Sequence, residues 1–416
     1  MHKDLSRLFQ IAKAPSRTII GLMSGTSLDG LDIAVCRFDG SGPGTKVSLL
    51  QFKTVSYPPA VKGRLKPISS KPQVDLQEVT LINAWLGSYF AELINNALAE
   101  WNIRPEQVDI IASHGQTIFH APYFQHQLEH YGNATLQIAD ADHIAVKTGI
   151  ITLSDFRQKH IAAGGEGAPL ALYGDYLMFS DQLEHRLLLN IGGIANFTWL
   201  PALQMTENSA ILPGVFSTDT GSGNTLMDQY VQQNFPGKQY DEDAELALSG
   251  KVNETLLEQL LELPFFSLAF PKTTGPEVFS LKHLEQVLKE VEAQDVDPKV
   301  QVNVALEHKR ISPVDVLATL AKFSSIGIVR AIAATIPADT KYKVYVSGGG
   351  MHNPLLIRNL EEQLAMKMES TESLGLNPDA KEAVLFALLA NECISGPEIH
   401  IEGQPAVAMG KISLPA

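Results

Sequence analysis

Cysteine is scarce in this chain of 416 residues, which has only Cys36 and Cys393, far apart in the sequence. Two such cysteines make neither a disulfide framework nor a zinc-binding spacing, and they favour a reducing compartment. We also find no run of the roughly 20 apolar residues that a membrane span needs. Residues 1–16 lack the apolar core of a signal peptide, so we expect a short leader of little structure in a cytoplasmic protein.

Positive charge is scarce as well. The 32 Lys and Arg residues stand against 46 Asp and Glu residues, which gives a net charge of −14. Without a basic excess we expect neither nucleic acid nor an anionic membrane as a partner, and we interpret the acidity as an aid to solubility. Any phosphate site must then be local, built from backbone donors, a metal ion and a few cations.

Glycine-rich turns are what the chain does have, and they follow three apolar runs of β-strand type. The segments read IIGLMSGTSLDGLD at 19–32, LLLNIGGIANF at 187–197 and VYVSGGG at 344–350. Glycine allows a ligand to approach the main chain, and successive free N–H groups form an anion-binding concavity. Because a strand, a glycine turn and a second strand occur once in each half, we infer an internal duplication and two hairpins that face one phosphate-bearing ligand.

This organisation predicts two α/β domains with mixed sheets around a central cleft, as expected for a chain of this length. After the leader at 1–16 we expect an N-terminal domain at 17–185, completed by a C-terminal helix at 379–393. A second α/β domain is expected at 186–378. A nucleotide held between two such domains is typical of a phosphotransferase.

The first turn also has a purely structural explanation, a tight hairpin, because it has neither the lysine of a Walker loop nor a Gly-x-Gly-x-x-Gly pattern. Its polar residues favour a ligand site. Thr26 and Ser27 are suited to donate to phosphate oxygens. Asp29 is suited to hold Mg²⁺, directly or through water, because Mg²⁺ prefers oxygen ligands.

The other two turns have structural explanations of equal weight. Gly192 and Gly193 form either a β-turn that covers the core or a second contact for nucleotide phosphates. Gly348 and Gly349 form either a strand-to-helix connection or a place where the backbone approaches a flat adenine ring closely.

Polar residues follow two further strands. Asp155 comes after the strand expected at 150–154, and it is either a general base on a rigid element or the partner of a local ion pair with Arg157. His114, Gln116 and Thr117 follow the strand expected at 108–113. For His114 a structural hydrogen bond is the default interpretation.

Several separate segments together are highly specific, and on them the chain resembles the anhydro-N-acetylmuramic acid kinase family from about Ile19 to the C-terminus. The segments are MSGTSLDGLD at 23–32, SHGQT at 113–117, DFR at 155–157, AAGGEGAPL at 162–170, LNIGGIANF at 189–197, DTGSGN at 219–224 and SGGGMHNP at 347–354. The resemblance implies the fold of the sugar kinase, chaperone and actin superfamily, with two duplicated actin-like (ribonuclease H-like) domains.

The resemblance also implies a reaction in which water opens the 1,6-anhydro bridge at C1 while O6 takes the γ-phosphoryl group of ATP, with Mg²⁺. It places the catalytic aspartate at Asp155 and implies a homodimer. The residues we expect to bind ATP are Gly25, Thr26, Ser27, Leu28, Asp29, Gly30, Leu31, Asp32, Gly192, Gly193, Gly348 and Gly349, with Asp29 on the metal. Those we expect to bind the amino sugar are His114, Gln116, Thr117 and Arg157.

The chain departs from the family pattern at Pro276, where an arginine is usual, and this puts one phosphate-side or substrate-side contact in doubt. Ser222 and Ala139 also replace usual residues, conservatively. Two alternatives therefore stay open: another sugar or acid kinase of the same fold, and a nucleotide-binding module that has lost transfer activity. The presence of Asp155 argues against the second.

Overall fold

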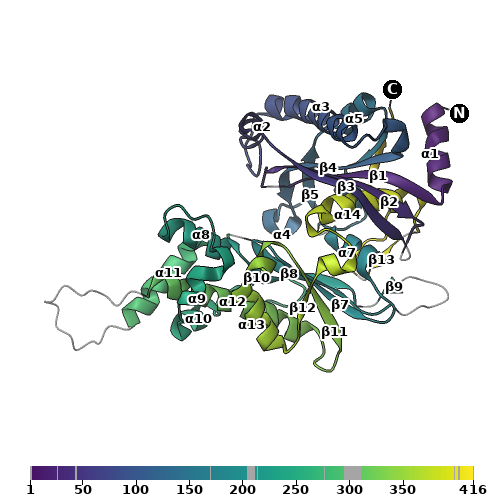
Figure 1. Cartoon of the computed structure of the whole chain (residues 1–416). Coiled ribbons are helices and arrows are strands. Elements are labelled where there is room, and N and C mark those ends of the chain that lie inside the picture. Colours follow the sequence, from purple (N-terminus) through teal and green to yellow (C-terminus); the bar gives the residue numbers. More distant parts are fainter. Residues whose placement is uncertain are drawn as a thin grey trace. The chain divides into compact units, whose positions relative to one another are not determined.

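The computed structural model describes residues 2–25, 27–42, 45–168, 170–203, 211–212, 214–275, 277–294, 311–397, 399–401 and 403–415 (Figure 1). Thr26 and Pro276, both discussed above, lie outside the described residues. The chain divides into two compact units. Unit 1 comprises Met1–Gln182, Leu203–Val215 and Leu376–Ala416, and unit 2 comprises Leu183–Ala202 and Phe216–Gly375.

Unit 1 is built on one mixed sheet in the order β14-β6-β4-β1-β2-β3, with β5 paired to β4. β1, β2 and β3 form an antiparallel meander, whereas β1, β4 and β6 are parallel. The strands of this sheet are β1 (Ser16–Ser24), β2 (Gly30–Asp39), β3 (Lys46–Ser56), β4 (Ile110–Ala121), β5 (Ala134–Ile138), β6 (Ile151–Ser154) and β14 (Lys411–Ser413). The short strands β9 (Ile211–Leu212) and β13 (His400–Ile401) pair with each other.

The helices of unit 1 are α1 (Lys3–Lys13), α2 (Pro59–Leu65), α3 (Leu76–Glu100), α4 (Tyr123–His126), α5 (Ala141–Thr148), α6 (Phe156–Ala162), α7 (Ala171–Phe179) and α14 (Lys381–Ser395). α14 lies directly on β1, so closely that a Cβ on Gly21 would come within 1.8 Å of the Ala383 carbonyl oxygen. The leader expected to have little structure is instead the helix α1, because Ile11 is buried and His2 caps its first turn.

Unit 2 repeats this topology. Its sheet has the order β10-β8-β7-β11-β12, in which β7, β8 and β10 are antiparallel while β7, β11 and β12 are parallel. The strands are β7 (His185–Ile191), β8 (Ile194–Leu200), β10 (Phe216–Ser222), β11 (Tyr342–Ser347) and β12 (Met368–Ser370). Two α/β units with mixed sheets of the same strand order confirm the predicted duplication.

The helices of unit 2 are α8 (Thr225–Asn234), α9 (Glu245–Ser249), α10 (Glu254–Leu260), α11 (Leu281–Gln294), α12 (Pro313–Thr335) and α13 (Pro354–Leu364). Among the described residues, α12 alone is long and apolar enough to cross a membrane by length and composition, so the expectation that the chain has no such segment does not hold for this helix. In the structure 72% of its apolar stretch is buried, and it packs against α9, α13 and β10 in the manner of a core helix.

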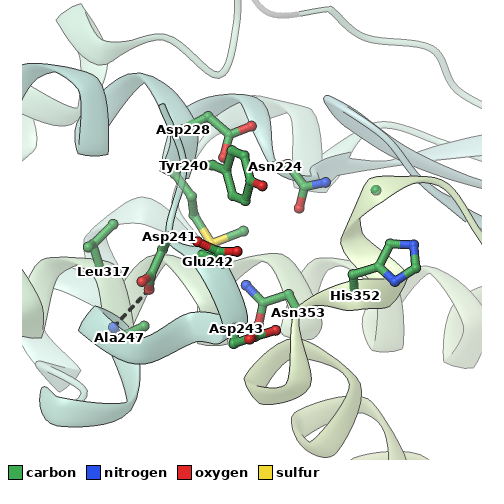
Figure 2. A pocket seen from close by; sticks show the side chains of 12 residues that line it. Asn224, Asp228, Tyr240, Asp241, Glu242, Asp243, Ala247, Leu317, His352 and Asn353 are labelled. Atoms are coloured by element: carbon green, nitrogen blue, oxygen red, sulfur yellow. Dashed lines mark hydrogen bonds between the residues drawn. The ribbon is translucent and has the colours of Figure 1, made fainter. Parts of the chain in front are cut away.

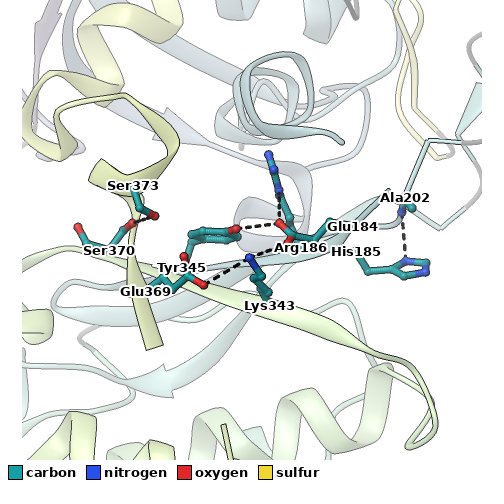
Figure 3. A network of polar contacts seen from close by, with 9 residues as sticks. All are labelled: Glu184, His185, Arg186, Ala202, Lys343, Tyr345, Glu369, Ser370 and Ser373. Atoms are coloured by element: carbon teal, nitrogen blue, oxygen red, sulfur yellow. Dashed lines mark hydrogen bonds and ion pairs between the residues drawn. The ribbon is translucent and has the colours of Figure 1, made fainter. Parts of the chain in front are cut away.

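An ion-pair network lies where the parallel strands of unit 2 begin (Figure 3). The Glu184 carboxylate accepts from Arg186 Nε at 2.8 Å and from the Tyr345 hydroxyl at 2.7 Å, and Lys343 Nζ lies 3.0 Å away. Although burial acts in the opposite direction, hydrogen bonds from Arg186, Tyr345 and Lys343 lower the pKa of Glu184 to about 2.

Glu184→Gln is therefore expected to destabilise the protein by about 1–2 kcal/mol at pH 7. Because the pKa of Glu184 is lower in the folded than in the unfolded protein, this stabilisation is complete above the unfolded value and is lost as pH falls toward 2. Urea unfolding of both proteins at pH 7 and pH 3.5 measures the difference, which should shrink at the lower pH. Glu362→Gln, at an exposed position of α13, is the control. A difference that is constant with pH would contradict this assignment.

Candidate active site

The first glycine turn connects β1 to β2 in unit 1. Leu28 N–H donates to the Gly25 carbonyl at 3.2 Å, and Leu28 has a left-handed φ of 59°. Tyr57 N–H, from the segment after β3, donates to the Asp29 carbonyl at 2.8 Å. The described part of this turn is therefore held at its two ends by backbone hydrogen bonds.

Three glycines of the predicted nucleotide site have room for a side chain. A Cβ would come no closer than 3.6 Å to another atom at Gly25, and no closer than 3.5 Å at Gly192 and Gly349. None of the three has a left-handed φ. Neither backbone conformation nor internal packing therefore requires glycine at these positions, which is what a surface for close ligand approach needs.

The structure brings the glycine turns of unit 2 together. Asn224 N–H donates to the Gly192 carbonyl at 2.8 Å, so the polar turn after β10 packs on the turn between β7 and β8. Gly348 has a φ of 83°, and a Cβ there would lie 2.7 Å from the Ile191 carbonyl oxygen. A Cβ on Gly193 would likewise lie 2.2 Å from Thr225 Oγ1. Gly193 and Gly348 thus have packing reasons to be glycine.

A pocket of about 420 Å³ lies beside these turns in unit 2 (Figure 2). Its lining residues are Asn224, Met227, Asp228, Tyr240, Asp241, Glu242, Asp243, Ala247, Leu317, Gly349, His352 and Asn353. Burial raises the pKa of Asp228 to about 6, and Asp241 accepts from the N–H groups of Leu246 and Ala247 at 2.9 Å each. So many carboxylates disfavour phosphate and favour N–H and O–H donors, such as those of adenine and ribose.

Asp155 lies at the end of β6 and directly before α6, with a left-handed φ of 53°. Such a conformation is strained for a residue other than glycine and is tolerated best by Asn and Asp. Its side chain is 27% exposed and pairs with Lys411 of β14. Among the described residues Asp155 therefore pairs with Lys411 and not with Arg157, the partner in the structural alternative.

Arg157 instead binds to two other groups. Its Nε donates to His114 Nε2 at 2.9 Å, and its Nη1 donates to the Gly167 carbonyl at 2.7 Å. Burial and then the Arg157 charge lower the pKa of the buried His114 to about 3, so His114 is neutral. These contacts agree with the structural interpretation of His114, and sugar binding by His114 and Arg157 stays a prediction.

Gln116 and Thr117 face protein groups in the described structure. Gln116 is 0% exposed and bonds to Ser24 and to the Gly25 carbonyl. The half-buried Thr117 accepts from Gln137 Nε2 at 3.0 Å. Their assignment to the sugar also stays a prediction.

The acidic residues of the first turn differ in their surroundings. Asp29 is 76% exposed and lies 3.7 Å from Lys62 Nζ, a weak surface pair. Asp32 accepts from Thr54 Oγ1 at 2.5 Å, and burial raises its pKa. A Cβ on Gly30 would lie 2.4 Å from the carbonyl oxygen of Val55 in β3, and Leu31 is buried in the core.

The first turn offers one accessible carboxylate, that of Asp29, to a cation. Within the described residues no three His, Cys, Asp or Glu side chains form a metal cage. Mg²⁺ in kinases needs only one or two carboxylates, because water and the nucleotide phosphates complete its coordination. The accessible Asp29 carboxylate suits that kind of site.

Sequence reasoning missed two residues that contact the site. Lys411 is 256 positions from Asp155 and meets it only because β14 pairs antiparallel with β6. Tyr57 follows β3 and contacts both Ser24 and Asp29. Neither residue lies in a sequence motif. The contact of Lys411 with Asp155 follows from the pairing of β14 with β6, which the sequence did not indicate.

Two α/β units whose sheets share one strand order define a duplicated α/β protein. The chain belongs to the anhydro-N-acetylmuramic acid kinase family, whose profile matches residues 17–403.

Relatives that carry this name match the chain over nearly its whole length. A protein of Pseudoalteromonas atlantica is 50% identical and covers 100% of both chains. A protein of Pseudoalteromonas translucida is 47% identical over 99% of both. One from Caldanaerobacter subterraneus is 36% identical and covers 99% of this chain and 100% of its own. Among solved structures, a ROK hexokinase from Thermus thermophilus covers 90% of this chain and 98% of its own at 13% identity, with a TM-score of 0.35 that is too low to bear on function.

Proposed function

We propose that this protein is an ATP-dependent kinase that opens the 1,6-anhydro bond of anhydro-N-acetylmuramic acid and phosphorylates O6. The products are N-acetylmuramic acid 6-phosphate and ADP, and the reaction belongs to murein recycling. The observation that carries the proposal is the family match over residues 17–403, which includes every predicted catalytic, nucleotide-binding and sugar-binding residue.

In this mechanism Asp155 is the general base. It accepts a proton from water while the water oxygen bonds to C1 and the C1–O6 bond breaks, as in an inverting glycosidase. O6 bonds to the γ-phosphorus and ADP leaves, so the departing oxygen needs no acid. Lys411 binds Oδ2 of Asp155, and this proposal assigns the proton to Oδ1.

The nucleotide contacts in this proposal follow the glycine turns. Residues 25–32 and Gly192–Gly193 bind the phosphates, and Gly348 and Gly349 adjoin the base. The pocket beside Gly349 supports this orientation, because its carboxylates suit the donors of the nucleoside rather than the phosphates. Asp29 would hold Mg²⁺, which when bound would supply the neutralisation of phosphate charge that phosphoryl transfer requires.

A coupled assay of ADP release tests the proposed reaction. Anhydro-N-acetylmuramic acid, glucose, N-acetylglucosamine and acetate are offered in turn, and ADP release is expected only with the first. Turnover of another acceptor would favour a different kinase of the same fold. Nucleotide binding without turnover of any acceptor would favour the inactive module.

A cytoplasmic location and a homodimer are part of the same proposal, the dimer from the family resemblance alone. Light scattering after gel filtration is expected to give twice the chain mass of 45.3 kDa. A mass of one chain at micromolar concentration would contradict the dimer and leave the proposed reaction untouched.

A further inference from the structure

A buried polar network lies beneath the first glycine turn. Ser24, at the end of β1, has its Oγ 2.5 Å from Gln116 Oε1 and 2.7 Å from the Tyr57 hydroxyl. Ser24, Gln116 and Tyr57 are 1%, 0% and 3% exposed. Gln116 Nε2 reaches the carbonyls of Gly25 at 3.0 Å and Thr117 at 3.2 Å. The three side chains therefore bind to one another and to the turn, away from water.

The direction of each hydrogen bond follows from the groups involved. Carbonyls of Gly25 and Thr117 can only accept, so the Gln116 NH₂ group faces them and its Oε1 faces Ser24. Oε1 can only accept as well, so the Ser24 hydroxyl donates to Gln116. The Ser24 proton is then used, and the Tyr57 hydroxyl must donate to Ser24 Oγ. A chain of donors runs from Tyr57 through Ser24 and Gln116 to the Gly25 carbonyl.

This network fixes the backbone on which the phosphates are proposed to lie. Gln116 holds the Gly25 end of the turn, and Tyr57 N–H holds the Asp29 end at 2.8 Å. A buried network with every member satisfied makes its surroundings rigid, whereas one missing partner leaves a costly unpaired group. The described ends of the turn are thus held by Gln116 and Tyr57, whose side chains have no surface to offer to a sugar.

We propose that Tyr57 and Gln116 are positioning residues of the nucleotide, which act on ATP through the turn at Gly25–Asp29. Gln116 is then not a sugar contact, contrary to its assignment from the motif. This inference rests on the proposed function for the identity of the nucleotide and for the second substrate. The predicted signature is a change in the KM for ATP with little change in the KM for the sugar.

Tyr57→Phe removes one hydroxyl and keeps the ring. Loss of a buried hydrogen bond is expected to raise the KM for ATP, and the Kd for ADP, roughly three- to tenfold, with kcat and the KM for the sugar within about twofold. Tyr131→Phe changes an exposed tyrosine of the same unit and is the matched control, for which no change is expected. An unchanged KM for ATP in a folded Tyr57→Phe protein would overturn the proposal.

Gln116→Glu keeps the shape of the side chain, and its ionised form cannot donate to the Gly25 carbonyl. Its KM for ATP is expected to rise more at pH 8.5 than at pH 6, because protonation of the new carboxyl group restores a donor. A rise confined to the KM for the sugar would overturn the positioning role. Calorimetry with ADP separates the two proposals, since wild-type protein that binds ADP without turning over the sugar would contradict only the proposed reaction.

Discussion

Asp155→Asn is expected to lower kcat by about 10²–10⁴, or roughly 3–5 kcal/mol of activation free energy, with ATP and sugar binding retained. Asparagine has the shape of aspartate and cannot accept the proton from water. It also tolerates the left-handed φ of 53° at this position better than other residues, so the end of β6 should keep its backbone. Turnover, substrate binding and melting temperature are measured for the purified variant.

Lys411→Ala is the matched control for this experiment, because it breaks the same ion pair and leaves the carboxylate in place. Lys411 is 62% exposed, so its loss should cost less than about 1 kcal/mol of stability and keep kcat within about tenfold. If both variants lose kcat equally, the pair rather than the base is what matters. Near-normal turnover of Asp155→Asn with a lowered melting temperature would contradict the catalytic assignment.

The sequence predicted the elements that carry the site, because glycine turns and strand ends are local signals. The turn after β1, the turn between β7 and β8 and the strand that ends before Asp155 all lie where their patterns indicated. The matching strand order of the two sheets agrees with the predicted duplication. Local patterns were sufficient here because the hairpins and strand ends are formed by residues close in sequence.

The sequence patterns did not predict contacts between segments that are far apart along the chain. Lys411 meets Asp155 only through pairing of β14 with β6, and this contact occupies the carboxylate for which Arg157 was the predicted alternative partner. His114, Gln116 and Thr117 lie within β4 (Ile110–Ala121), whereas we expected them to follow a strand that ends at 113. The Gln116 amide is turned inward to Ser24. Residues 3–13 form a helix because Ile11 has a buried position to fill.

The reason for each glycine could not be read from the sequence either. Gly21 is required by the contact of α14 with β1, and Gly193 by the side chain of Thr225, whereas Gly25 and Gly192 meet no such neighbour. Substitution of Gly25 or Gly192 tests a ligand site, because the protein has room for the new side chain. Substitution of Gly21 or Gly193 would disturb packing within the protein. Valine at Gly193, for example, would strike Thr225 at the start of α8.

Gly25→Ala and Gly192→Ala are each expected to raise the KM for ATP at least about tenfold, a loss of roughly 1.4 kcal/mol of binding free energy. The added methyl has room in the protein, at 3.6 Å and 3.5 Å from its nearest neighbours, so it should act on the approaching phosphates and not on the fold. Gly63→Ala, in α2 with no atom within 4 Å of the new Cβ, is the control and should leave the KM for ATP unchanged. Initial rates over a range of ATP concentrations, with the melting temperature of each variant, measure the effect. Unchanged ATP kinetics in both stable variants would remove these turns from the nucleotide site.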